Sequence, residues 1–164
     1  MKVIPVPCLQ DNYAYLVIDE SSKEAAVVDP SEAPPVLAAI AQAGVKLVAI
    51  LSTHHHWDHI GGNKALLKAM PDLAVYAHVS DVGRVDGQTV QLNSGDTFKV
   101  SGLEVRTLHN PGHTTGAVSY VIEDAVFTGD TMFAAGCGRL FEGTPAMMYT
   151  SLCKTLGSLP PETR

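Results

Sequence analysis

Hydrophobic positions occur along the chain in short runs separated by polar segments that contain glycine and proline. Runs rich in branched and aromatic residues predict β-strands. They cover residues 13–19, 24–28, 47–51, 73–77, 98–100, 103–108, 118–122 and 125–128. The first runs alternate with helical segments, and those between residues 73 and 128 follow one another as a predicted meander. This order is typical of an α/β protein with mixed sheets.

Three segments have the pattern of helices. The first is predicted to begin at Ser31 as N-cap, has two prolines in its first turn and ends at Gly44. The second covers residues 63–70, and the third covers residues 146–156. Core packing is predicted for the apolar positions of the third, which are Met147, Tyr149, Leu152, Cys153 and Leu156.

Length and charge narrow the classes of function. A chain of 164 residues with 46% hydrophobic content predicts one domain with a sizeable core. Eleven Lys and Arg against seventeen Asp and Glu give a net charge of -6, without a basic run, which argues against a nucleic-acid partner. No apolar stretch is long enough to cross a bilayer. The start of the chain has no apolar signal segment, so we expect a cytoplasmic protein.

The three cysteines also favour a reducing compartment. They are odd in number and widely spaced, which suits reduced thiols better than a disulfide framework. Cys8 and Cys153 are predicted to be small buried hydrophobic residues.

The candidate chemistry is concentrated in residues 53–59, THHHWDH, directly after the predicted strand 47–51. Its HxHxDH pattern places His54 and His56 on one side of an extended turn, and Asp58 and His59 on the other. Two adjacent metals can therefore share one loop. Imidazole and carboxylate groups are ligands that zinc, iron and manganese accept. The alternative is a solvated histidine-rich loop that binds metal only adventitiously.

Two downstream residues favour the metal site over that alternative. His113 lies in NPGHTTG at 110–116, and Asp130 lies in FTGDT at 127–131, each in a glycine-containing turn after a predicted strand. Three strand ends that meet at one rim are where α/β folds build active sites. The other histidines, His55, His78 and His109, lack this context and are expected to be surface or satisfied loop residues. A supporting role beside the ligands stays open for His55.

These motifs resemble glyoxalase II, a family of hydroxyacylglutathione hydrolases within the metallo-β-lactamase superfamily. THHHWDH, NPGHT and GDT are followed by GCGR at 136–139 and FEGT at 141–144. DNY at 11–13 and LPPET at 159–163 also match, so the resemblance covers essentially the whole chain. HxHxDH is shared by the superfamily, whereas the segment from GCGR to FEGT is more specific to glyoxalase II.

The resemblance implies an αββα sandwich of two mixed sheets flanked by helices, with two divalent metal ions at its rim, zinc being favoured. The first metal would be held by His54, His56 and His113. The second would be held by Asp58 and His59, with Asp130 bridging both. Asp58 would also orient the attacking hydroxide. The implied reaction is hydrolysis of an S-2-hydroxyacylglutathione, such as S-lactoylglutathione, in methylglyoxal detoxification.

Substrate contacts are implied for two residues. Arg139 would pair with a glutathione carboxylate, which a guanidinium can bind in bidentate fashion. Phe141 stands where the family commonly has a tyrosine, so no phenolic hydrogen bond comes from that position. An exposed loop arginine is the competing interpretation of Arg139.

The family continues beyond the segment 159–163 into a further strand, a GHEY-like turn with another metal ligand, and a helical substrate-binding domain. We therefore expect residues 1–164 to be a catalytic domain shortened at its C-terminus. Other interpretations stay open: a β-lactamase, a persulfide dioxygenase-like enzyme with one iron, or a catalytically poor metal-binding or interaction protein. The sequence does not predict an oligomeric state.

Overall fold

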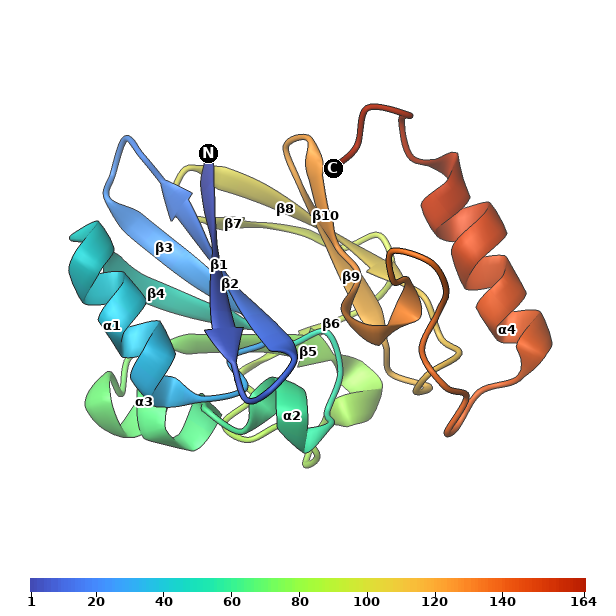
Figure 1. The fold of residues 1–164 in the computed structure, drawn as a ribbon, viewed down its shortest axis with the longest axis horizontal. Helices are drawn as coiled ribbons and strands as arrows, with labels where there is room; N and C mark the ends of the chain where they lie inside the picture. The colour runs from blue at the N-terminus through green and yellow to red at the C-terminus, as the bar shows by residue number, and fades with distance from the viewer.

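The computed structural model describes residues 1–164, which form two sheets with helices beside them (Figure 1). The first sheet has six strands in the order β1-β2-β3-β4-β5-β6. They are β1 (Lys2–Cys8), β2 (Asn12–Asp19), β3 (Glu24–Val28), β4 (Lys46–Leu51), β5 (Ala74–His78) and β6 (Val90–Leu92). Strands β1 to β3 pair antiparallel and β3 to β6 pair parallel, so this sheet is mixed, as expected.

The second sheet has the order β10-β9-β8-β7 and is antiparallel throughout. The expectation that it would be mixed is therefore wrong. The sheet contains β7 (Thr97–Val100), β8 (Leu103–His109), β9 (Val118–Ile122) and β10 (Ala125–Phe127). The meander predicted from residue 73 is therefore wrong at its start, because β5 lies parallel to β4 in the first sheet. A helix between β4 and β5 supplies the crossover that a parallel pair requires.

Two strands were not predicted from the sequence. Strand β1 contains Pro5 and Pro7, which lack a backbone N–H, and it lies at the edge of the first sheet where proline is tolerated. Strand β6 has only three residues, and it forms the opposite edge of the same sheet.

The helices are α1 (Ala33–Ala43), α2 (Trp57–Ile60), α3 (Asn63–Ala69) and α4 (Pro145–Tyr149). Helix α1 ends at Gly44 as predicted, with a left-handed φ of 64°. Its N-cap is Glu32, so the prediction of Ser31 is wrong by one residue. No side-chain cap bond forms there, and Pro34 has no N–H to donate to one. None of the helices combines the length and apolar character that crossing a membrane requires.

The apolar core has two layers. One layer packs α1 and α3 on the first sheet, and its cluster includes Val36, Leu66 and Ile50. The other lies between the two sheets and includes Leu51 and Tyr120, both fully buried. The hydroxyl of Tyr120 donates to the carbonyl oxygen of Ser52 at 2.8 Å. This bond fixes the end of β4 to the second sheet, directly before the histidine motif.

The C-terminal helix packs by a different face from the one predicted. Helix α4 continues as a π-helix (Thr150–Thr155) and a 3-10 turn (Leu156–Ser158), on the side of the molecule opposite α1 (Figure 1). Because a π-helix has more residues per turn, the 3.6-residue pattern fails along it. Buried positions are Met148, Ser151 and Leu156, whereas Met147, Tyr149 and Cys153 are exposed. Burial of Leu156 and Cys8 is confirmed, and burial of Cys153 is wrong.

Candidate metal centre

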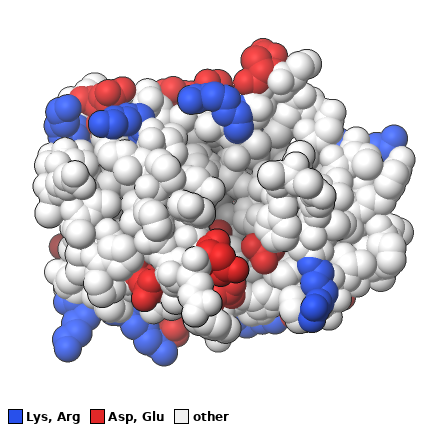
Figure 2. Space-filling model, in the orientation of Figure 1, with Lys and Arg blue, Asp and Glu red and all other residues white.

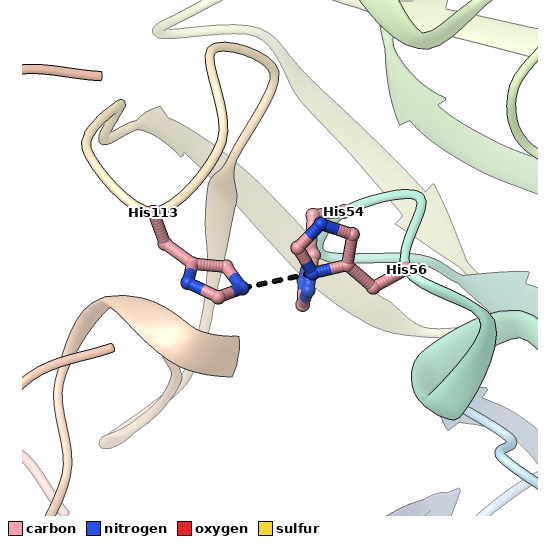
Figure 3. A group of neighbouring side chains, drawn as sticks. All are labelled: His54, His56 and His113. Atoms are coloured by element: carbon pink, nitrogen blue, oxygen red, sulfur yellow. Dashed lines mark hydrogen bonds between the residues drawn. The ribbon is translucent and has the colours of Figure 1, made fainter. Parts of the chain in front are cut away.

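Three strand ends deliver the candidate ligands to one place. The histidine motif follows β4, the turn with His113 follows β8, and Asp130 follows β10 in a short 3-10 turn (Gly129–Thr131). Figure 3 shows the rings of His54, His56 and His113 facing one another from two separate loops. The structure therefore brings these strand ends together, as the sequence predicted.

The three histidines form a compact nitrogen cluster. One ligand atom from each lies within 4.8 Å of the others. His113 Nε2 is 2.9 Å from His56 Nδ1, the contact drawn as a dashed line in Figure 3. His54 Nδ1 lies 3.1 Å from the Thr53 hydroxyl, while its Nε2 is buried without any hydrogen-bond partner. A buried nitrogen without a partner is costly unless it binds an ion.

Electrostatics keep His54 and His56 of this cluster neutral. Burial, and then the neighbouring imidazoles, hold the pKa of His54 well below its usual range. Burial and the His113 ring lower the pKa of His56 in the same way. A neutral imidazole has a free lone pair, which is the state that a metal ion requires. The nitrogen cluster is therefore suited to hold a divalent cation.

Carboxylates surround the fourth histidine of the motif. His59 Nε2 lies 3.1 Å from Asp130 Oδ1 and 3.6 Å from Asp58 Oδ2. Although burial lowers the pKa of His59, the carboxylates of Asp29 and Asp130 outweigh it and raise the value to about 10. Without a cation, an imidazolium at this position neutralises the clustered negative charge.

Asp130 lies between the two groups. Its Oδ2 is 3.4 Å from His113 Nε2, whereas its Oδ1 faces His59. Burial raises the pKa of Asp130, but the hydrogen bond and charge of His59 lower it by more. The net pKa lies below the usual value, so the carboxylate is ionised. One carboxylate with an oxygen toward each histidine group has the arrangement expected for a bridging ligand.

Asp29 is a buried residue that sequence reasoning missed. Its carboxylate accepts hydrogen bonds from the Thr53 backbone N–H at 2.7 Å and the Thr53 hydroxyl at 2.6 Å. It also lies 2.9 Å from His59 Nδ1. Asp29, His54 and His59 form a second group of potential ligand atoms. We assign Asp29 to orienting His59 instead, because its oxygens are already engaged and its contact leaves His59 Nε2 facing Asp58 and Asp130.

Asn12 was matched to the family motif without a role, and it contacts Asp58. Its side-chain amide donates to the Asp58 carbonyl at 2.9 Å and to the Asp58 carboxylate at 3.3 Å. Both Asn12 and Asp29 adjoin strand ends, as the ligands do. Strand-end position was a weak signal for both, but their contacts with Asp58 and His59 have no sequence pattern.

Arg139 and Phe141 lie beside the nitrogen cluster and are both exposed. The Arg139 carbonyl lies 2.7 Å from His113 Nδ1, which fixes that ring through the backbone. The Phe141 ring stands edge-on to the rings of His56 and His113, with centroids 5.3 Å from each. The Arg139 guanidinium lies 5.7 Å from the centre of the Phe141 ring. An arginine and an aromatic side chain therefore adjoin the candidate metal centre.

A cavity of about 530 Å³ opens on the other side of the site. It is lined by Asp58, His59 and Asp130 together with apolar side chains that include Tyr13 and Phe133. Figure 2 shows acidic side chains around a hollow near the middle of the face drawn, with lysines and arginines mainly toward its edges. This cavity provides room for a small molecule next to the carboxylates.

The fold and this site define a class of protein. Residues 10–164 match the sequence profile of the Metallo-beta-lactamase superfamily, and the chain belongs to that superfamily. It is 50% identical to a hydroxyacylglutathione hydrolase from Synechococcus sp. over 99% of this chain. The chain spans 66% of that relative's own length.

Two solved structures have the same fold and about a third of the sequence in common. ETHE1 from Myxococcus xanthus is 32% identical with a TM-score of 0.86, covering 99% of this chain and 73% of its own. TTHA1623, in a di-iron-bound form, is 32% identical with a TM-score of 0.80, covering 99% of this chain and 89% of its own. The αββα fold is therefore confirmed, and one relative holds two metal ions.

Proposed function

We propose that residues 1–164 are the catalytic domain of a metal-dependent thioester hydrolase that cleaves an S-2-hydroxyacylglutathione to a 2-hydroxy acid and glutathione. The position of Asp130 carries this proposal, because its two oxygens face two separate ligand groups. The similarity to a hydroxyacylglutathione hydrolase supports the substrate class. The presence of two iron ions in TTHA1623 supports a binuclear centre.

The donor set fits two divalent ions, zinc being favoured. His54, His56 and His113 would hold one, Asp58 and His59 would hold the other, and Asp130 would contact both. Bound metal ions supply a hydroxide near neutral pH, because they lower the pKa of water from about 15.7 to about 7. Asp58, held by Asn12, would keep that hydroxide oriented by accepting its proton in a hydrogen bond.

The remaining residues bind the substrate. Arg139 would pair with a carboxylate of the glutathione moiety, and Phe141 would shield the carbonyl side of the site from water. The glutathione thiol needs no general acid to leave, since a free thiol has a pKa of about 8.5. No histidine or carboxylate beyond the ligand set is therefore required as a general acid.

The test is hydrolysis of S-lactoylglutathione, followed by loss of the thioester absorbance, with metal content measured on the same sample. We expect turnover when two ions are bound per chain, and its loss in His54→Ala. His78→Ala is the matched control, because it removes an imidazole outside the site. Both should be repeated in a version extended to the length of the curated relatives.

The outcomes separate the alternatives. Two bound metals with no thioester hydrolysis in either version would overturn the proposal. A single bound iron, with oxygen consumption on a persulfide substrate, would assign the site to dioxygenase chemistry instead.

A further inference from the structure

Glu142 connects the segment that carries Arg139 and Phe141 to two other parts of the molecule. Its Oε2 accepts the backbone N–H of Thr115 at 2.8 Å and the Thr115 hydroxyl at 2.9 Å. Its carboxylate also pairs with the guanidinium of Arg84, which lies 58 residues earlier in the chain. Thr115 follows His113 by two residues, so this ion pair fixes the turn that carries a candidate ligand.

The guanidinium of Arg84 also lies close to His55 and Asp81. Arg84 Nη2 lies 2.6 Å from His55 Nε2, and Arg84 Nη1 lies 3.6 Å from Asp81 Oδ1. His55 Nδ1 lies 3.2 Å from the same Asp81 oxygen. Because a guanidinium only donates, His55 Nε2 accepts from Arg84. His55 Nδ1 and the Asp81 carboxylate are close but form no hydrogen bond, and the supporting role of His55 stays a prediction.

Charge within this group agrees with the geometry. We call His55, Asp81, Arg84, Thr115 and Glu142 the Arg84 network. The hydrogen bond from Arg84 lowers the pKa of Glu142 to about 2. Glu142 is therefore ionised at pH 7 and forms a true ion pair with Arg84. Asp81 is fully buried, its carboxylate oxygens have no hydrogen-bond partner, and it lies beside the partly exposed Arg84–Glu142 ion pair as a neighbouring charge.

Segment 138–143 depends on these contacts because it has no regular secondary structure. Its backbone is held by N–H groups of Phe141 and Glu142, which donate to the His113 carbonyl at 3.1 and 3.3 Å. The N–H of Gly143 donates to the Gly112 carbonyl at 3.1 Å. Only Glu142 joins the segment through an ionised side chain to a distant element. Loss of that contact would leave the segment held by backbone groups alone: these three bonds, the bond from the Gly138 N–H to the Asp130 carbonyl at 2.9 Å, and the contact of the Arg139 carbonyl with His113.

We propose that Arg84 and Glu142 are positioning residues that hold segment 138–143 against the His113 turn and so determine how tightly the site binds its substrate. Neither touches the reacting atoms. They act by placing the Arg139 guanidinium and the Phe141 ring beside the nitrogen cluster. The effect on substrate rests on the proposed function, whereas the placement of the segment does not.

The placement is tested by hydrogen exchange of the amides of Phe141, Glu142 and Gly143 in the zinc-loaded chain. Arg84→Ala and Glu142→Gln should speed exchange about tenfold. Arg84→Lys keeps the positive charge and should restore most of the protection. Lys64→Ala is the matched control, because Lys64 on α3 forms a separate exposed ion pair, with its Nζ 3.2 Å from Asp86 Oδ1. Unchanged exchange in Arg84→Ala would overturn the proposal.

The substrate effect is tested by steady-state kinetics on the same variants. Arg84→Ala should raise KM about fivefold and leave kcat within about twofold, the signature of lost binding and not of lost chemistry. Faster exchange with unchanged KM would contradict the positioning role. The same would follow if Arg84→Lys and Arg84→Ala changed KM and kcat to the same extent. A parent chain that binds zinc but hydrolyses no thioester would overturn the proposed function alone, and the exchange data would still decide the placement.

Discussion

Replacing Asp29 by asparagine tests whether a carboxylate outside the proposed ligand set supports the metal centre. Asp29 is 4% exposed and receives two bonds from Thr53 and one contact from His59 Nδ1. Its φ of 47° lies in the left-handed region, which asparagine tolerates better than most residues. The substitution therefore removes the charge and one acceptor oxygen with little added backbone strain.

The magnitude follows from the geometry of the amide. If the asparagine oxygen keeps the Thr53 N–H, its NH₂ group faces the Thr53 hydroxyl and His59 Nδ1. The hydroxyl can accept instead of donate, but His59 Nδ1 must give up its proton in order to accept from the amide. One charge-assisted bond is lost, which costs about 1.5–3 kcal/mol of unfolding free energy. Metal affinity should fall about 10–100-fold, the usual effect of losing such a partner.

The assay is chelator competition for bound zinc, together with urea unfolding of the metal-free chain. Asp19→Asn is the matched control, because Asp19 also accepts several bonds, from Ser21, Ser22, Ser101 and Gly102, at the opposite end of the β2–β3 pair. Both variants should be less stable, and only Asp29→Asn should lose zinc more readily. Equal zinc affinity in Asp29→Asn and the parent would refute the orienting role.

Three further predictions concern single side chains. Asp130→Ala should reduce zinc binding from two ions per chain to one, measured by elemental analysis; two tightly held ions would exclude the bridge. Arg139→Ala should raise KM about tenfold with kcat nearly unchanged, and an unchanged KM would place it outside the site. Burial raises the pKa of Asp81 to about 6, above its unfolded value of 3.8. The stabilising contribution of Asp81 is therefore present below pH 4 and lost by about pH 6. Across that window, urea titrations of the metal-free parent should show a falling unfolding free energy relative to Asp81→Asn.

The candidate ligands could be predicted because their signal is local. The spacing of HxHxDH is contained in six residues, and His113 and Asp130 each follow a recognisable strand. Apolar runs predict the strands, and the ends of the strands lie at one rim of the fold. The fold class followed from the same pattern together with the family resemblance.

The parts that were missed depend on long-range contacts or on departures from regular periodicity. Asp29 meets His59 across 30 residues, and Arg84 meets Glu142 across 58. Neither pair has a sequence pattern of its own. Strand β1 was missed because Pro5 and Pro7 argue against a central strand. Proline is tolerated in an edge strand, but the sequence does not reveal which strand lies at an edge. The burial of Cys153 was mispredicted because a π-helix begins at Thr150, whereas Met147 and Tyr149 lie in α4 itself, two residues apart, and so cannot share the face that buries Met148.

The two halves of the site are supported by different physics. The candidate ligand His59 depends on the buried carboxylate of Asp29, and losing a partner of a buried charge is costly. Segment 138–143 depends on a partly exposed ion pair, and such pairs contribute about 0–1 kcal/mol unless they form a network. The hydrogen bonds of Asp29 and the Arg84 network have no residue in common, so changes in one should add to changes in the other. Because the support of the substrate segment is weaker and separate, substitutions there can change substrate affinity while the metal centre persists.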